Sequence, residues 1–176
     1  MKKFTGTGVA LVTPFKADGA IDYPALESVI EHVILGNVDY LVVQGTTGES
    51  ATLSEEEKMD VLSFTIKINR SRVPIVYGLG GNNTAGILSA IDNIDFSEIA
   101  AVLSVSPYYN KPSQSGIIAH YTALADKCPV PVILYNVPGR TMSNLSANTT
   151  LAELKKLAGT WSNACVLPMA SRTIFF

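Results

Sequence analysis

Residues 40–50 read Tyr40-Leu41-Val42-Val43-Gln44-Gly45-Thr46-Thr47-Gly48-Glu49-Ser50, an apolar segment that continues directly into a loop rich in hydroxyl groups. The apolar part has β-branched and large residues and ends at glycine, which is typical of a buried strand. Gly45 and Gly48 allow a tight backbone path near a ligand, and Thr46 and Thr47 place two hydroxyls there. We therefore expect a binding loop for a small, oxygen-rich molecule at one end of a sheet.

Two other interpretations of this loop can be weighed from the residues. It could be a strand-to-helix turn whose threonines only cap the following helix, and the sequence leaves that alternative open. A phosphate-binding P-loop is excluded, because Glu49 stands where that motif requires lysine.

A strand followed by a helix recurs along most of the chain. Ser54 and Glu57 form the expected capping box of one helix, and Asp22 with Pro24 marks the start of another. Predicted strands cover about 8–12, 40–43, 73–77, 100–105 and 130–134, and predicted helices cover about 22–35, 54–68, 84–94, 113–127 and 146–157. Short, nearly continuous apolar strands alternating with helices predict an α/β fold with a parallel sheet, either doubly wound or part of an eight-fold barrel. Both architectures place their sites at the carboxyl ends of the strands.

Composition restricts the class of protein. Of the 176 residues, 47% are hydrophobic, and a net charge of −2 leaves no basic face for nucleic acid. We expect one domain, no membrane helix, no cofactor and a cytoplasmic location with Cys128 and Cys165 as reduced thiols. His32 and His120 are isolated in helical patterns and predict no metal site. The glycines at 78–81 do not predict dinucleotide binding, because Asn83 occupies the place of the third glycine in that motif.

Four segments in order resemble the dihydrodipicolinate synthase and N-acetylneuraminate lyase family of pyruvate-dependent aldolases. They are Gly8-Val9-Ala10-Leu11-Val12-Thr13-Pro14-Phe15, Gly45-Thr46-Thr47-Gly48-Glu49-Ser50, Pro107-Tyr108-Tyr109-Asn110-Lys111-Pro112 and Tyr135-Asn136-Val137-Pro138-Gly139-Arg140-Thr141. The resemblance extends over about residues 6–148 and implies a (β/α)8 TIM barrel. It also implies a homo-oligomer, either a dimer or a tetramer.

Family chemistry joins pyruvate to a lysine amine as a Schiff base and adds the resulting enamine to an aldehyde, which requires groups that transfer protons. By resemblance, Thr46, Tyr109 and Tyr135 form the proton relay, with Tyr109 reaching into a neighbouring subunit, and Thr47 holds the pyruvate carboxylate. Either Tyr108 or Tyr109 could instead fill a subunit contact.

Arg140 distinguishes the subfamilies. Its guanidinium can bind a carboxylate through two hydrogen bonds, as the carboxylate of aspartate semialdehyde requires. By resemblance, the synthases of lysine (diaminopimelate) biosynthesis carry arginine here, and the sialic acid lyases do not. The alternatives are a pyruvate aldolase that acts on a sugar acid, and a non-catalytic fragment.

The carboxyl-terminal part departs from the family pattern. A gap-free alignment places Asn163 at the position of the Schiff-base lysine, and no lysine follows Lys156. Lys155 and Lys156 fall in the fifth predicted helix, where a solvated face is expected. We therefore expect residues 1–158 to be the amino-terminal part of a barrel, truncated after about five strand-helix units, and residues 159–176 to be a divergent tail.

Lysine feedback is expected to be weak. By resemblance, lysine-inhibited members bind lysine near the positions of Ser50, Ala51, Asn82 and Tyr108. They carry glutamate where this chain has Gly86, and histidines where it has Glu55 and Lys58.

Overall fold

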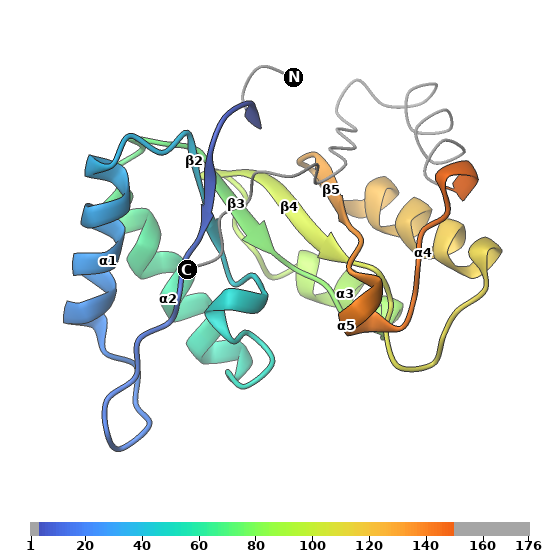
Figure 1. Cartoon of the computed structure of the whole chain (residues 1–176), viewed down its shortest axis with the longest axis horizontal. Helices are drawn as coiled ribbons and strands as arrows, with labels where there is room; N and C mark the ends of the chain where they lie inside the picture. Colours follow the sequence, from blue (N-terminus) through green and yellow to red (C-terminus); the bar gives the residue numbers. More distant parts are fainter. Residues whose placement is uncertain (1–3, 150–176) are drawn as a thin grey trace. The chain divides into compact units, whose positions relative to one another are not determined.

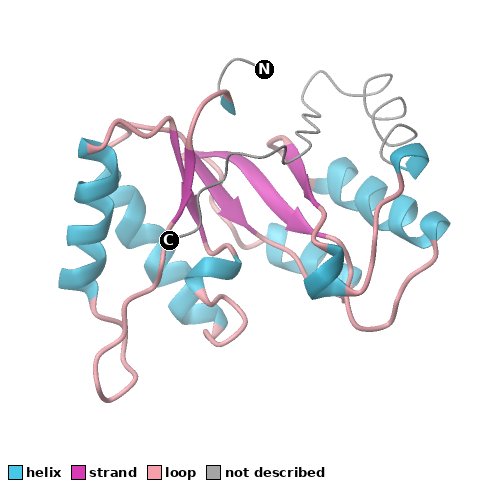
Figure 2. Ribbon diagram, in the orientation of Figure 1, coloured by secondary structure: helices cyan, strands magenta, loops and turns pink. Residues whose placement is uncertain are grey.

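The computed structural model describes residues 4–149, which form an α/β fold with a five-stranded parallel sheet. Figure 2 shows the strands and helices of this part of the chain. The strands are β1 (Gly8–Ala10), β2 (Tyr40–Val43), β3 (Ile75–Gly78), β4 (Ile99–Val105) and β5 (Val132–Tyr135). The helices are α1 (Tyr23–Leu35), η2 (Thr46–Gly48), α2 (Glu55–Asn69), α3 (Thr84–Ile91), α4 (Gln114–Lys127) and α5 (Pro138–Thr141). The expected fold class is confirmed.

The strand order decides between the two architectures that the sequence left open. The strands lie in the order β1-β2-β3-β4-β5, which is their order along the chain. A doubly wound sheet reverses its direction of growth at a switch point, whereas a barrel adds each strand on the same side. The observed order is therefore that of a barrel. Within the described residues, the chain forms two compact units, 4–78 with 98–100 and 79–97 with 101–149, which are described separately below.

The first unit contains β1, β2 and β3, with α1 packed against α2 beside them (Figure 1). Gly8 pairs with Tyr40 in β1 and β2, and Val42 pairs with Val76 in β2 and β3. The predicted capping box is present, because Ser54 Oγ accepts from Glu57 N at 3.2 Å and Ser54 N donates to a Glu57 carboxylate oxygen at 2.8 Å. These bonds satisfy amides that the first turn of α2 would leave without partners.

Arg72 joins the end of α2 to α1 in this unit. Its guanidinium donates to both carboxylate oxygens of Glu31, at 2.8 and 2.6 Å, and also to the carbonyl oxygens of Ile68 and Asn69. The bond from Arg72 lowers the pKa of Glu31. Arg72 precedes β3 and therefore lies at the amino-terminal side of the strand, where barrels carry contacts for stability rather than function.

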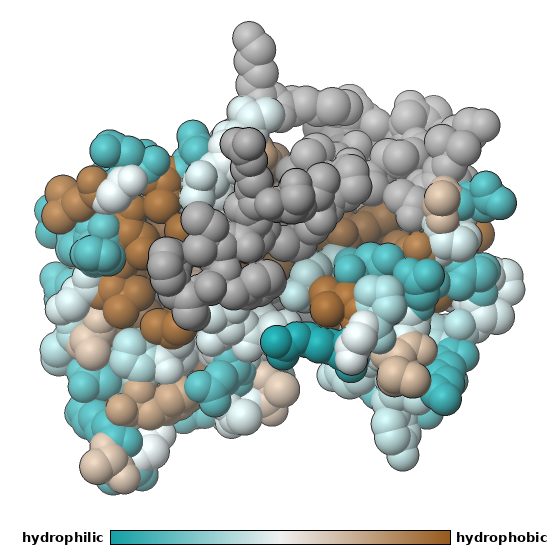
Figure 3. Space-filling model, viewed as in Figure 1, coloured by the Kyte–Doolittle hydropathy of each residue, from teal (hydrophilic) through white to brown (hydrophobic). Residues whose placement is uncertain are grey.

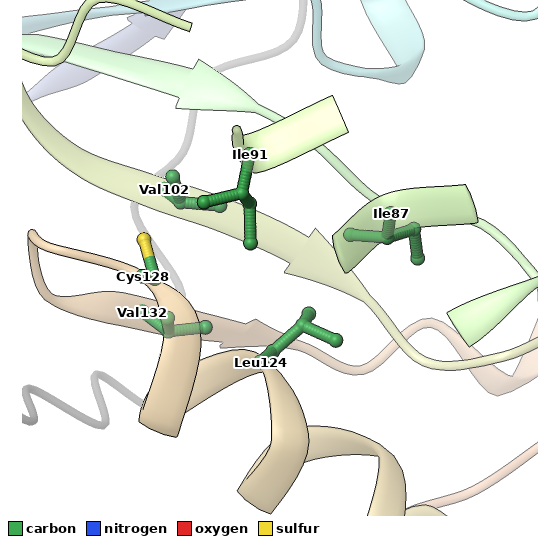
Figure 4. Packing of buried hydrophobic residues seen from close by; sticks show 6 residues of the cluster. All are labelled: Ile87, Ile91, Val102, Leu124, Cys128 and Val132. Atoms are coloured by element: carbon green, nitrogen blue, oxygen red, sulfur yellow. The ribbon is translucent and has the colours of Figure 1, made fainter. Parts of the chain in front are cut away.

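The second unit contains β4 and β5, with α3 packed against α4. Figure 4 shows six side chains of its core, which come from both strands and both helices and point toward one another: Ile87, Ile91, Val102, Leu124, Cys128 and Val132. A second cluster joins Ile117, Tyr121, Leu134 and Leu145. The hydroxyl of Tyr121 donates to the carbonyl oxygen of Ser104 at 3.0 Å, which satisfies a buried polar group.

Several element boundaries differ from the predictions. β1 ends at Ala10 rather than Val12, β3 begins at Ile75 rather than Val73, and α3 ends at Ile91 rather than Ile94. The short helix α5 was not predicted at all. Most of the helix expected over 146–157 lies outside the described residues, as do Cys165, Lys155, Lys156 and Asn163.

Two of the predictions concern features expected to be absent, a membrane-spanning helix and a metal site. Residues 4–149 contain no helix that is both long and apolar enough to cross a membrane. The same residues contain no group of three or more histidine, cysteine or acidic side chains that could hold a metal ion.

Candidate active site

The loop after β2 forms a single 3₁₀ turn, η2, which lies against β1. Gly48 N donates to Gly45 O at 3.0 Å, and Glu49 N donates to Thr46 O at 3.1 Å. The buried hydroxyl of Thr13 donates to Gly48 O at 2.7 Å. The turn is therefore also held to the segment that follows β1, by a threonine to which the sequence pattern assigned no role.

The two threonines of this turn do not cap the next helix. Ser54 caps α2, so the alternative interpretation of Thr46 and Thr47 as capping residues is wrong. The Thr46 side chain is exposed and that of Thr47 is partly exposed. Both hydroxyls follow the carboxyl end of a buried strand, which is where a ligand site is expected in a parallel sheet.

Left-handed backbone in this loop occurs at residues other than the glycines. Gln44 has φ 60° and Glu49 has φ 53°, whereas Gly45 has φ −70°. Gln44 and Glu49, rather than the two glycines, therefore adopt the left-handed conformation that turns the backbone here. The side chain of Gln44 is 4% exposed, and neither polar atom of its amide has a hydrogen-bond partner within the described chain.

The segment after β4 presents two tyrosines to the surface. Tyr108 is 39% exposed and Tyr109 is 81% exposed. Figure 3 shows that hydrophobic and hydrophilic side chains are interspersed on the visible face of the molecule. Tyr109 has φ 73°, a left-handed conformation that is unusual for a bulky residue and often occurs at functional positions. Its phenol therefore projects from a bent segment rather than from a strand.

Tyr135 is the last residue of β5 and is 8% exposed. Its carbonyl oxygen accepts from Ser106 N at 3.0 Å, which extends the pairing of β4 and β5. Leu134 belongs to the cluster with Ile117 and Tyr121 of α4, and successive side chains of a strand point to opposite faces. Tyr135 is therefore on the face of β5 opposite to α4.

Arg140 lies in α5, directly after β5, and its side chain is exposed. Among the residues that the structure describes, no carboxylate forms an ion pair with Arg140. The ion pairs are those of Lys58 with Glu55, Arg72 with Glu31 and Lys127 with Asp92. A guanidinium without such a partner can donate two hydrogen bonds to the carboxylate of a ligand.

Two titratable side chains near these segments have shifted pKa values, and both shifts come mainly from burial. Burial raises the pKa of Tyr77 in β3 to about 12, and the Glu55 carboxylate adds to that increase. Burial lowers the pKa of His120 in α4, where Thr84 Oγ1 lies 2.7 Å from His120 Nδ1. Neither group follows the carboxyl end of a strand, and both have a structural explanation.

The predicted site residues divide between the two compact units. Thr46 and Thr47 belong to the first unit, and Tyr109, Tyr135 and Arg140 belong to the second. Each of them ends a strand or lies in the segment that follows one. This location defines a class of proteins, the parallel α/β barrels whose sites lie at the carboxyl ends of the strands.

The chain belongs to the dihydrodipicolinate synthetase family, whose model matches residues 3–164. It is 54% identical over 161 residues to a 4-hydroxy-tetrahydrodipicolinate synthase of Cytophaga hutchinsonii, covering 90% of this chain and 54% of that protein. It is 53% identical over 162 residues to the synthase of Flavobacterium psychrophilum, covering 90% of this chain and 55% of that protein. The chain therefore spans about half the length of these relatives.

A solved structure supports the same family. The dihydrodipicolinate synthase of Acinetobacter baumannii in complex with pyruvate is 41% identical and superposes with a TM-score of 0.81. The match covers 84% of this chain and 51% of that protein. The resemblance stated from the sequence is confirmed, and so is the TIM-barrel family that it implied.

Proposed function

We propose that this chain carries the amino-terminal part of a lyase that condenses pyruvate with aspartate semialdehyde to 4-hydroxy-tetrahydrodipicolinate, in the diaminopimelate route to lysine. The observation that carries the proposal is the identity of 54% to a protein named for this activity, over nearly the whole chain. The reaction adds the enamine carbon of lysine-bound pyruvate to the aldehyde. It needs no cofactor beyond the lysine amine.

Each proposed role fits the placement of its residue. Thr47 would hold the pyruvate carboxylate from the 3₁₀ turn after β2, since its hydroxyl is partly exposed there. Thr46, Tyr109 and Tyr135 would transfer protons, because hydroxyl and phenol groups both donate and accept. The exposed phenol of Tyr109 is consistent with a role in the site of a neighbouring subunit, and hence with a homo-oligomer.

Arg140 favours aspartate semialdehyde over a sugar acid as the second substrate. The aldehyde end of aspartate semialdehyde is the reacting end, and its carboxylate remains free to bind a guanidinium. An exposed arginine without an intramolecular carboxylate among the described residues is suited to that task. In the second candidate, a pyruvate aldolase for sugar acids, the carboxylate of the sugar acid belongs to the pyruvate half, which Thr47 would hold, so the charge of Arg140 would have no carboxylate to bind.

A chimaeric enzyme tests the proposal directly. Residues 1–149 of this chain would be joined to the remaining carboxyl-terminal part of the Cytophaga hutchinsonii relative, with that relative as the control. We expect the chimaera to form product from pyruvate and aspartate semialdehyde. A folded chimaera that turns over a sugar acid faster than aspartate semialdehyde would contradict the proposal.

The 176-residue chain itself is expected to be catalytically silent, because a gap-free alignment with the family places Asn163 at the Schiff-base position. Reduction with borohydride in the presence of labelled pyruvate measures this, since only an imine is reduced to a stable adduct. The chimaera is the positive control. Stoichiometric labelling of the chain would contradict the expectation. Mass spectrometry of the labelled chain would then identify which lysine carries the pyruvate adduct.

A further inference from the structure

The segment that carries Arg140 forms a closed loop, which we define as residues 136–146 and call the Arg140 loop. Its first residue, Asn136, bonds to its far end through the side-chain amide. Asn136 Oδ1 accepts from Leu145 N at 3.1 Å, and Asn136 Nδ2 donates to Asn144 Oδ1 at 3.0 Å. The same amide therefore fixes the distance between the two ends of the loop.

Gln114 holds the same end of the loop from outside. Its Nε2 donates to Asn144 O at 2.8 Å, and its Oε1 accepts from Ser146 N at 3.0 Å and from the hydroxyl of Thr149. Gln114 is the first residue of α4, and that helix directly follows the 107–112 segment that carries Tyr109. This side chain thus connects the segment of one predicted site residue to the loop of another.

The middle of the loop is also bonded at several points. Thr141 Oγ1 donates to Ser143 O at 2.7 Å and accepts from Ser143 N at 3.2 Å. The hydroxyls of Ser143 and Ser106 lie 2.9 Å apart, which links the loop to the residue that follows β4. Met142 N donates to Pro138 O at 2.9 Å, while the Met142 residue itself is left-handed and 66% exposed.

We propose that Gln114 and Asn136 are positioning residues that hold the Arg140 loop in one conformation and connect it to the Tyr109 segment. The inference rests on the proposed function for its meaning, since Arg140 would bind the substrate carboxylate and Tyr109 would transfer protons. Neither amide touches a substrate in this scheme. Each acts through the backbone that it holds. A small displacement of Arg140 or Tyr109 would remove a large part of the contribution of that side chain to binding or proton transfer.

An amide is needed at both positions because the loop presents donors and acceptors together. Gln114 faces a carbonyl oxygen and an amide N–H, and Asn136 faces an amide oxygen and an amide N–H. Only a side chain that donates and accepts at once satisfies both. Glutamate at position 114 would keep the acceptor for Ser146 N and lose the donor to Asn144 O.

Amide hydrogen exchange and ¹⁵N relaxation of the purified 176-residue chain test the proposal without any substrate. In Gln114→Met we expect the Ser146 amide to exchange about 3–10 times faster, the range set by the loss of one net hydrogen bond. In Asn136→Leu we expect the same change at Leu145. In both variants the order parameters of Gly139, Arg140 and Thr141 should fall from about 0.85 to below about 0.6.

Asn93→Leu is the matched control, because the exposed side-chain amide of Asn93 makes a local bond, from Nδ2 to Ser89 O at 3.0 Å, and none to the Arg140 loop. This control variant should leave the exchange rates of the loop amides unchanged. Both test variants should leave the exchange rate of the Val102 amide, which lies in the core, unchanged. Gln114→Glu should restore protection of Ser146, since its acceptor is retained. Unchanged loop amides, or equal acceleration at Val102, would overturn the proposal. Neither result depends on activity, so failure of the proposed function remains distinguishable.

Discussion

Replacing Gly78 with alanine should displace the backbone that leads into the threonine turn. Gly78 ends β3, and the left-handed Gln44, which follows β2, lies beside it. A Cβ atom on Gly78 would lie 2.2 Å from Gln44 O, 2.6 Å from Gln44 C and 3.0 Å from Gly45 N. These neighbours are backbone atoms, so no side-chain rotation can relieve the contact.

The magnitude follows from the size of that overlap. The contact with Gln44 O is about 1 Å inside the 3.4 Å at which ordinary contact begins. Overpacking of this kind costs about 1–3 kcal/mol, and more where the backbone must move. Because Gly45 directly precedes η2, the backbone shift should also move Thr46 and Thr47.

Urea unfolding followed by circular dichroism measures the loss of stability. With an m value of about 1–3 kcal/mol/M, a loss of about 2 kcal/mol lowers the midpoint by about 1 M. Gly81→Ala is the matched control, since its added Cβ would meet only the Ile87 side chain, at 3.7 Å. Equal midpoints for the two variants would refute the reasoning, because they would mean that the close approach of Gln44 does not require glycine at position 78.

Three further predictions concern the catalytic chimaera and the chain. In the chimaera, Arg140→Ala should lower kcat/KM for aspartate semialdehyde about 10–100-fold, as expected for a charge-assisted hydrogen bond, with imine trapping of pyruvate unchanged; equal loss of trapping would mean that Arg140 maintains the fold. Lysine below about 1 mM should leave the chimaera active, because Gly86 offers no carboxylate to the ammonium group of lysine and its binding therefore loses about one charge-assisted hydrogen bond. Strong inhibition at these concentrations would contradict this. Burial lowers the pKa of His120, so the unfolded chain binds a proton near pH 6.5 that the folded chain does not. Stability should be complete above about pH 6.5 and decrease as the pH falls toward the folded-state pKa; His120→Gln should flatten this dependence, and an unchanged profile would assign it to other groups.

The sequence by itself determined the alternation of strands and helices and the chemical character of the loops. Ser54 and Glu57 illustrate why, since a capping box involves residues three positions apart and is encoded locally. The positions of Thr46, Tyr109 and Arg140 after their strands, and of Tyr135 at the end of its strand, follow from the same local pattern. The roles of these residues still come from the family resemblance and remain proposals.

Only the tertiary structure decided the strand order, the bend at Gln44 and the contacts of Gln114 and Asn136. Gly78 and Gln44 are 34 residues apart, and Gln114 bonds to residues 30 and 32 positions away. No local pattern encodes such pairs, because the conformation of Gln44 and the partners of each amide depend on which strands become neighbours. The short helix α5 escaped prediction for a related reason. Its four residues contain no hydrophobic period, and the Arg140 loop that contains it is bonded to Gln114, which lies 30 and 32 positions from its partners Asn144 and Ser146.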